Sequence, residues 1–440
     1  MQSIKDISFE TLSEKILGKG FPPHLTGAVA LTELSPDAQG FIIRMLDLMK
    51  RSRYSIAQFN PVLIRWLSTT IPSILPNAWG GQIPPITVSG RHKKLDDYIV
   101  KQNFPCNKEQ NIFIDVGCGF PPMTTIDTAR RLPEWQVYGV DRSFADYVLY
   151  DSKGHYACFN QAGKFLYFQT SMNSDSKPVY ADPRGTINRF KVLFQDLLPL
   201  LQNTVSQSCE TAEKNGAKLI RNHAMDFETA NFNFIKSDMM DLPPMKAQVI
   251  RCMNLFLYFA HNTRKESLHH IKNHLLHNGL LIIGTNGLGA QSRYTVYRKK
   301  YDELILHEFA FSLDNLSHIS LIPWFTIHEK DPEAMLLAQL AGTIRSNRSF
   351  WTGFSEAIDQ LLEHHGLCKR KIDGFLYFPK TMMLPKEFLK TNAMLWQDMK
   401  EKGYLKDVVD ILTNAGYDAW INPVDDIAIR PPGQSITQSL

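Results

Sequence analysis

Two glycines and an acidic residue lie at the end of an apolar run at residues 111–119. The run NIFIDVG is followed by Cys118 and Gly119, so Asp115, Gly117 and Gly119 lie close together. Glycine has no Cβ, and it therefore permits a tight turn with positive φ and a close approach of backbone amides to a ligand. Pro121 and Pro122 follow, as is common where a helix begins. The pattern predicts a strand, a ligand-binding loop and a helix.

Two further acids end apolar runs. Asp141 ends QVYGVD, where a carboxylate can accept hydrogen bonds from both hydroxyls of a ribose. The alternative is a surface ion pair with the neighbouring Arg142. Asp238, in SDM, can accept a hydrogen bond from an adenine amino group while Met239 lies against the base. For this tripeptide the alternative is a helix N-cap followed by a core methionine.

The apolar runs have the length and composition of buried strands. They lie at 111–117, 136–141, 233–238, 247–254 and 279–286. A helical pattern, TTIDTARRLPEW, separates the first two runs, and TRKESLHHIKNHLLHNG separates the last two and is expected to end its helix at Gly279. Because strands and helices alternate, we expect an α/β fold with a mostly parallel, doubly wound sheet covered on both faces.

The remaining segments extend this core. We expect a helical module at 1–85, a core at 86–325 and a mainly helical region at 326–440. An insertion at 145–230 contains YVLYDSKGHYACFNQAGKFLYFQ, whose turn residues predict a three-stranded meander, followed by a helix. Either a hairpin at 292–312 or a helix with two short strands at 408–432 completes the sheet, and the sequence does not choose between them.

Together, IDVGCG, VYGVD and SDM resemble the class I S-adenosylmethionine-dependent methyltransferases over about residues 105–290. The resemblance implies a Rossmann-like core and S-adenosylmethionine as cofactor. It also implies that VIRCMNLFLYF, which is similar to a stretch of chemotaxis-receptor glutamate methyltransferases, places Asn254 near the cofactor. The cofactor-binding residues it implies are Asp115, Gly117, Cys118, Gly119, Asp141, Arg142, Asp238, Met239 and Asn254.

The implied reaction is methyl transfer to an O or N acceptor. Asn254 and Tyr258 follow the fourth strand and are the candidates for contact with the acceptor. The alternative for Tyr258 is an aromatic residue at a helix start that packs in the core. A nicotinamide-dependent oxidoreductase is the alternative enzyme, but Pro122 occupies the position of the third glycine in G-x-G-x-x-G. A third alternative is a module that binds the cofactor without catalysis.

Composition limits the class of protein. Apolar residues make up 44% and charged residues 21% of the 440 residues, which is typical of a folded chain. The net charge of +4 gives no indication of a nucleic-acid partner, and we expect no membrane partner. The six cysteines form no pair with metal-ligand spacing, so we expect no metal. The segment MQSIKDISFE lacks the basic start and apolar stretch that are typical of a signal peptide. We therefore expect a cytoplasmic protein unless a specialised apparatus secretes it. The methyl acceptor, a small molecule or a protein, is not identified.

Overall fold

A computed structural model gives the structure of the chain. It describes residues 36–54, 87–104, 111–142, 145–171, 174, 179, 182–201, 210–287, 291–317, 322–328, 331–370, 376–377 and 385–431. Most of the amino-terminal helical module expected at 1–85 lies outside these residues. The part of it that is described contains α3 (Pro36–Arg51), which has the helical pattern expected for GFIIRMLDLMKR.

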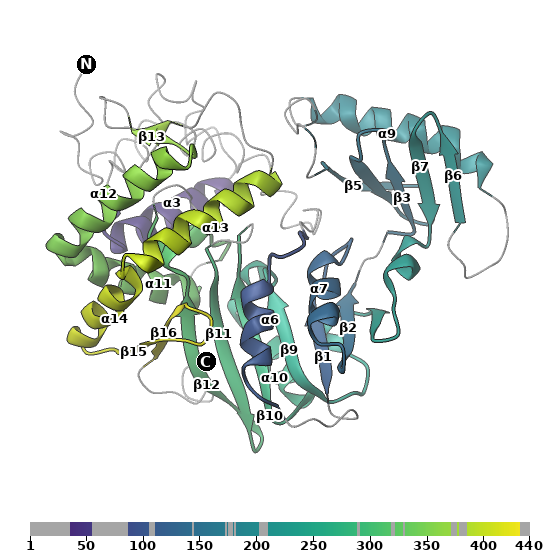
Figure 1. Cartoon of the computed structure of the whole chain (residues 1–440). Helices are drawn as coiled ribbons and strands as arrows, with labels where there is room; N and C mark the ends of the chain where they lie inside the picture. The colour runs from purple at the N-terminus through teal and green to yellow at the C-terminus, as the bar shows by residue number, and fades with distance from the viewer. Residues whose placement is uncertain are drawn as a thin grey trace.

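Five parallel strands form one side of a nine-stranded sheet (Figure 1). They are β1 (Ile112–Val116), β2 (Gln136–Asp141), β8 (Phe232–Lys236), β9 (Ala247–Met253) and β10 (Leu275–Thr285). Their spatial order is β8-β2-β1-β9-β10, with β8 at the edge of the sheet, and each neighbouring pair is parallel. The chain thus builds the sheet outward from β1 in one direction and then from β9 in the other, so the point where the order reverses lies between β1 and β9. The expected doubly wound, Rossmann-like fold is confirmed.

Helices cover both faces of this sheet. α6 (Lys93–Val100) and α7 (Met123–Arg131) pack on one face, and α10 (His261–Asn273) packs on the other. Each strand buries apolar side chains on both faces, which explains why the runs lack a polar alternation.

The expectation that the helix before β10 ends at Gly279 is wrong. α10 ends at Asn273, and Gly279 lies inside β10. A Cβ at Gly279 would lie 2.9 Å from the carbonyl oxygen of Leu276 and 3.1 Å from that of Gln248. The glycine therefore permits a close backbone approach within the sheet rather than the end of a helix.

Both candidate segments complete the sheet. The hairpin forms β11 (Arg293–Lys300) and β12 (Glu303–Phe311), which follow β10 with antiparallel pairing. The carboxyl-terminal strands β15 (Asp418–Ile421) and β16 (Ile427–Arg430) then add to β12. The alternatives left open by the sequence are therefore neighbours in one sheet.

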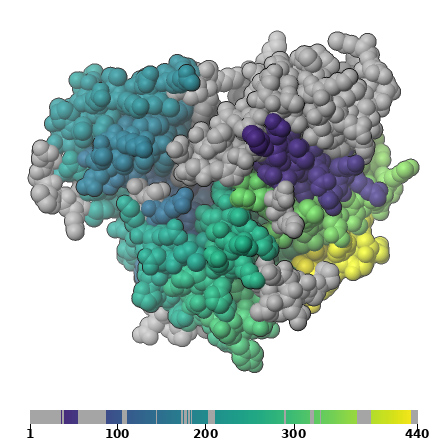
Figure 2. Space-filling model, turned by 180° about the vertical axis from the view of Figure 1, so that it is seen from behind, coloured from purple at the N-terminus to yellow at the C-terminus, as the bar shows by residue number. Residues whose placement is uncertain are grey.

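The insertion forms a second sheet with the order β5-β4-β3-β7-β6. Its elements are β3 (Tyr147–Tyr150), β4 (Tyr156–Phe159), β5 (Phe165–Gln169), α9 (Pro183–Leu197), β6 (Glu210–Lys214) and β7 (Ala217–Arg221). The predicted meander is β3 to β5, and β7 extends it by pairing with β3. α9 covers one face of this sheet, and the insertion stands above the core as a lobe of its own (Figures 1 and 2).

The segment after β12 is mainly helical, as expected. It contains α11 (Pro332–Ser346), α12 (Arg348–His364), α13 (Pro385–Glu401) and α14 (Tyr404–Asn414), with the short strands β13 (Lys369–Arg370) and β14 (Leu376–Tyr377). These helices and α3 share one apolar core, so α3 packs with elements that lie about 300 residues later in the chain.

Short 3-10 turns connect several elements. They are η5 (Leu198–Leu200), η6 (His223–Phe227), η7 (Met239–Asp241), η8 (Phe256–Tyr258), η9 (Leu313–Leu316) and η10 (Ile322–Trp324). Among the residues that the structure describes, no helix has the length and apolar character needed to span a bilayer.

Candidate functional site

The glycine loop lies at the carboxyl ends of β1 and β2. The amides of Gly117 and Cys118 donate to the carbonyl oxygen of Val140 over 2.8 and 3.2 Å, which ties the loop to β2. Gly117 has a φ of 73° and Gly119 a φ of 68°, a region that side chains with a Cβ rarely adopt. A Cβ at Gly117 would also lie 3.1 Å from Leu255. Both glycines are therefore required by the backbone of this loop.

Asp141 reaches the same loop from the end of β2. Its Oδ2 accepts a hydrogen bond from the amide of Gly119 over 3.0 Å. The structure therefore brings together the glycine and the carboxylate that the sequence places on different strands. Arg142 follows as an exposed residue at the tip of β2.

Asp115 is buried below the loop. Arg251 of β9 donates to both of its carboxylate oxygens, over 3.0 and 2.6 Å, and the hydroxyl of Thr125 donates to one of them over 2.7 Å. Arg251 also donates to Asp96 of α6 over 2.8 Å. Burial raises the pKa of Asp96 to about 6, although Arg251 acts against that rise. Asp115 therefore supports the loop through β9 and α7.

The side chain of Cys118 lies against β2. A Cβ at Gly139 would be 3.1 Å from its Sγ, and the residue is 3% exposed. Burial raises the pKa of the thiol well above its ordinary value, and the nearby Asp141 and Asp115 act in the same direction. The thiol is thus a neutral packing group, and a contact of Cys118 with the cofactor stays a prediction about its backbone.

Asp238 and Met239 follow β8 at the same edge of the sheet. The Oδ1 of Asp238 accepts a hydrogen bond from the amide of Met240 over 3.0 Å, so this carboxylate caps η7. Met239 is 7% exposed and packs with α10. The observed contacts are those of an N-cap with a core methionine, and Asp238 keeps an exposed side chain at the end of the strand.

Asn254 connects the tips of β9 and β10. It has a φ of 58°, its amide donates to the carbonyl of Gly284 over 2.8 Å, and its Oδ1 accepts from the amide of Asn286 over 2.9 Å. Tyr258 lies in η8, and its carbonyl accepts a hydrogen bond from Nε2 of His328 over 2.9 Å. Burial raises the pKa of the Tyr258 phenol, and Arg91 acts to lower it.

Arg91 and His92 join this region and were not predicted. Arg91 donates to the carbonyls of Asn286 and of Gly287, the latter over 3.0 Å, and burial lowers its pKa to about 10. His92 is 7% exposed, and neither ring nitrogen has a hydrogen-bond partner among the described residues. Burial, then Arg251 and Arg91, lower its pKa well below the ordinary value, so the ring is neutral. The only signal in the sequence is the polar run RHKK before a helix.

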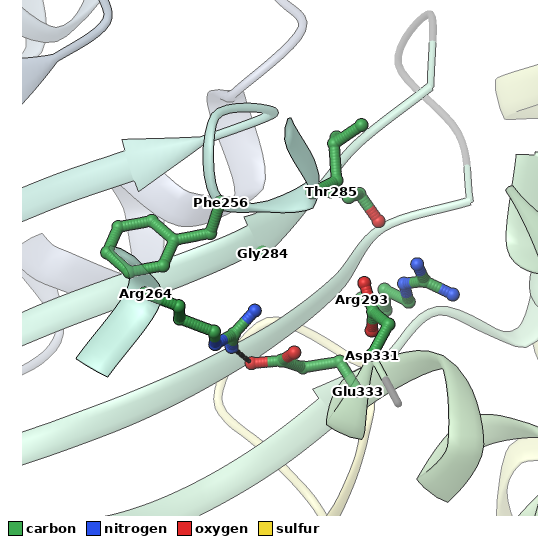
Figure 3. Close-up of a pocket in the computed structure, with 8 residues that line it drawn as sticks. Phe256, Arg264, Gly284, Thr285, Arg293, Asp331 and Glu333 are labelled. Atoms are coloured by element: carbon green, nitrogen blue, oxygen red, sulfur yellow. Dashed lines mark hydrogen bonds and ion pairs between the residues drawn. The ribbon is translucent and has the colours of Figure 1, made fainter. Parts of the chain in front are cut away.

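A pocket of about 230 Å³ opens beside the tips of β9 and β10 (Figure 3). Its lining consists of Phe256, Leu257, Arg264, Gly284, Thr285, Arg293, Asp331 and Glu333. Arg264 of α10 and Glu333 of α11 form an ion pair across it, as the dashed line in Figure 3 shows. Arg293 is 1% exposed and donates to the carbonyls of Pro323 and Phe325. The walls therefore offer both hydrogen-bond donors and acceptors close to Asn254.

Within the described ranges, no group of three or more His, Cys, Asp or Glu side chains is placed to hold a metal ion.

Several polar features lie at this edge of the sheet. They are the glycine loop, a carboxylate at the end of β2, a second carboxylate at the end of β8 and the polar tips of β9 and β10. In a doubly wound sheet, the crevice outside the carboxyl ends of the strands at the reversal point is where ligands bind.

No family model and no curated protein sequence matches the chain. Solved structures do match it. The plantazolicin methyltransferase BpumL in complex with SAH is 13% identical, and the match covers 89% of this chain and 97% of that chain with a TM-score of 0.25. For a putative S-adenosyl-L-methionine-dependent methyltransferase from Methanococcus maripaludis, the identity is 11%, the coverage 83% and 91%, and the TM-score 0.24.

PKMT2 from Rickettsia typhi in complex with AdoHcy is 15% identical to the chain. The match covers 46% of this chain and only 26% of that chain, with a TM-score of 0.23. The chain therefore spans about a quarter of the length of the Rickettsia protein. The fold assignment comes from the strand order, which is the mostly parallel, doubly wound arrangement implied by the resemblance to class I methyltransferases.

Proposed function

We propose that the chain is an S-adenosylmethionine-dependent methyltransferase that acts on an O or N acceptor. The observation that carries the proposal is the hydrogen bond between the amide of Gly119 and Asp141, which joins the glycine loop and the β2 carboxylate at one edge of the sheet. A nucleoside with an amino-acid tail requires such a pair. The glycine loop lets the tail approach the backbone closely, and the carboxylate accepts hydrogen bonds from the ribose diol.

The residues of this edge suit the parts of S-adenosylmethionine. Gly117 and Gly119 would pack against its methionine portion, Asp141 would accept hydrogen bonds from the ribose, and Asp238 with Met239 would bind the adenine. Asp115 and Arg251 would hold the loop in place from below. The cofactor itself supplies an electrophilic methyl group, because that methyl is attached to a sulfonium.

The chain's part in the reaction is chiefly alignment. An acceptor atom must lie in line with the S–CH₃ bond, with water excluded. Asn254 and Tyr258 lie at the tip of β9, where they would contact the acceptor, and the pocket lined by Thr285 and Glu333 is adjacent.

The test is a comparison of cofactors followed by a transfer assay. The purified chain is titrated calorimetrically with S-adenosylhomocysteine and, separately, with NAD. We expect binding of S-adenosylhomocysteine alone, and binding of NAD alone would favour the oxidoreductase. The chain is then incubated with methyl-tritiated S-adenosylmethionine and a cell extract. Incorporated label indicates catalysis, whereas cofactor binding without any incorporation favours a non-catalytic module.

A further inference from the structure

The insertion turns a face rich in tyrosine toward the glycine loop. One face of its sheet packs under α9. The other face buries Val148 and Cys158 against Phe120, with Tyr150, Tyr156 and Tyr167 partly buried beside them. Phe120 directly follows Gly119 in the chain. The insertion is therefore in contact with the loop that the proposed function assigns to the cofactor.

Two phenol hydroxyls of this face point at one backbone atom. The Oη atoms of Tyr156 and Tyr167 each lie 3.5 Å from the carbonyl oxygen of Phe120. An O–H···O hydrogen bond is usually about 2.7–2.8 Å long, so both contacts are stretched. The Tyr167 hydroxyl also forms a hydrogen bond with the thiol of Cys158. A thiol is a weak hydrogen-bonding partner, so this phenol can turn to a ligand oxygen at little cost.

Tyr167 also lies within the electrostatic reach of Asp141. Burial raises the pKa of its phenol well above the ordinary value, and the neighbouring Cys158, Tyr156 and Asp141 act in the same direction. The phenol is therefore a neutral hydrogen-bond donor near the β2 carboxylate. Asp141, in contrast, can only accept hydrogen bonds.

We propose that Tyr167 is a nucleoside-binding residue whose hydroxyl donates to a ribose oxygen, opposite Asp141, with Tyr156 beside it as part of the same wall. A ribose diol has both hydrogens to donate and lone pairs to fill, and a carboxylate with a phenol satisfies both. The insertion is thereby part of the cofactor site as well as a lobe above it. This inference rests on the proposed function and adds a residue from outside the three motifs.

The experiment is a calorimetric titration with S-adenosylhomocysteine of the full chain and of three variants that each remove one hydroxyl. Tyr167→Phe should weaken binding about tenfold, the loss expected for one hydrogen bond, and Tyr156→Phe should weaken it less. Tyr147→Phe is the control, because Tyr147 lies on the opposite face of the same sheet against Phe194 of α9. It should bind as the wild type does.

A second titration uses adenosine, 2′-deoxyadenosine and 3′-deoxyadenosine. Tyr167→Phe should lose affinity for adenosine but bind one of the two deoxynucleosides as the wild type does, because that ligand lacks the oxygen that the phenol contacts. If wild type and Tyr167→Phe bind S-adenosylhomocysteine equally, the hydroxyl only docks the insertion and this inference is overturned while the proposed function stands. If the wild type binds no S-adenosylhomocysteine, the proposed function itself fails.

Should Tyr167→Phe unfold, the Tyr156→Phe titration still decides, because Asp141 alone would make the wild type bind the two deoxynucleosides more weakly. Unchanged binding of S-adenosylhomocysteine by Tyr156→Phe would then overturn the inference, and a loss of affinity supports it.

Discussion

Arg251 of β9 donates to both carboxylate oxygens of Asp115 on the adjacent strand β1, over 3.0 and 2.6 Å, in a region where both side chains are almost fully buried. The same guanidinium donates to Asp96 of α6. One cation therefore joins β1, β9 and α6 directly below the glycine loop, and it neutralises two carboxylates that water does not reach.

Replacing this cation should be costly. Arg251→Met leaves Asp115 and Asp96 buried without a positive partner, and we expect a loss of about 3–5 kcal/mol in the free energy of unfolding, measured with urea. Lys93→Ala is the control, because its ion pair with Asp97 is exposed and should contribute less than about 1 kcal/mol. Equal losses in the two variants would contradict a structural role for Arg251.

Gly119→Val should abolish the binding of S-adenosylhomocysteine, with a loss of at least about a hundredfold in affinity. The branched side chain occupies the loop surface, and the positive φ of 68° adds strain of about 1–2 kcal/mol. Gly403→Val is the matched control, since Gly403 has a φ of 87° and a Cβ there meets nothing within 4 Å. It should lose similar stability but keep the affinity. Weakened binding by both variants would show that strain alone explains the loss.

The stability of the chain should fall as pH rises from about 4.5 to 7, in part through Glu308. Burial raises the pKa of this carboxyl to about 7 from an ordinary 4.5. Between these two values the folded chain keeps a proton that the unfolded chain has already released. The free energy of unfolding therefore falls across this range, by up to roughly 3 kcal/mol once the pH exceeds the folded pKa. Glu308→Gln should make the free energy of unfolding, measured with urea from pH 4 to 8, depend less on pH between about 4.5 and 7. Glu303→Gln, at the exposed end of the same strand, should leave it unchanged.

Asn254 should affect methyl transfer more than cofactor binding. Its Oδ1 holds the amide of Asn286 in place, so Asn254→Gly, which keeps the backbone conformation free of strain, should lower tritium incorporation at least about tenfold. Asn254→Asp retains an acceptor oxygen and should restore most of the rate. Affinity for S-adenosylhomocysteine should change less than about threefold. Full incorporation by Asn254→Gly would remove this residue from the site.

The sequence predicted the core well because each element there has a local signal. Apolar runs ending in glycine, aspartate or asparagine identified β1, β2, β8, β9 and β10, and the parallel arrangement followed from the alternation with helices. The proximity of Gly119 and Asp141 also followed, since parallel strands end at the same edge. One available signal was overlooked. Asn215 and Gly216, both with positive φ, form the turn of the β6–β7 hairpin.

The remaining features depend on contacts between distant segments. The pocket needs Glu333 of α11 to reach Arg264 of α10, and no local pattern encodes that pairing. Arg91 reaches the tip of β10 because α6, which follows it in the chain, packs on the sheet. The thiol of Cys118 packs beneath β2 because Gly139 leaves room for it. In each case the chemistry of the residue is visible in the sequence, whereas its neighbour is set by tertiary packing.

The central claim is that Asp141 and the glycine loop bind one nucleoside. The most direct measurement is a calorimetric titration of wild type and Asp141→Asn with S-adenosylhomocysteine, with circular dichroism to establish that both are folded. We predict that the wild type binds one equivalent and that the variant binds about ten to a hundred times more weakly, as expected for lost hydrogen bonds to a charged group. Wild-type protein that gives no binding heat, or a folded variant with undiminished affinity, would contradict the account.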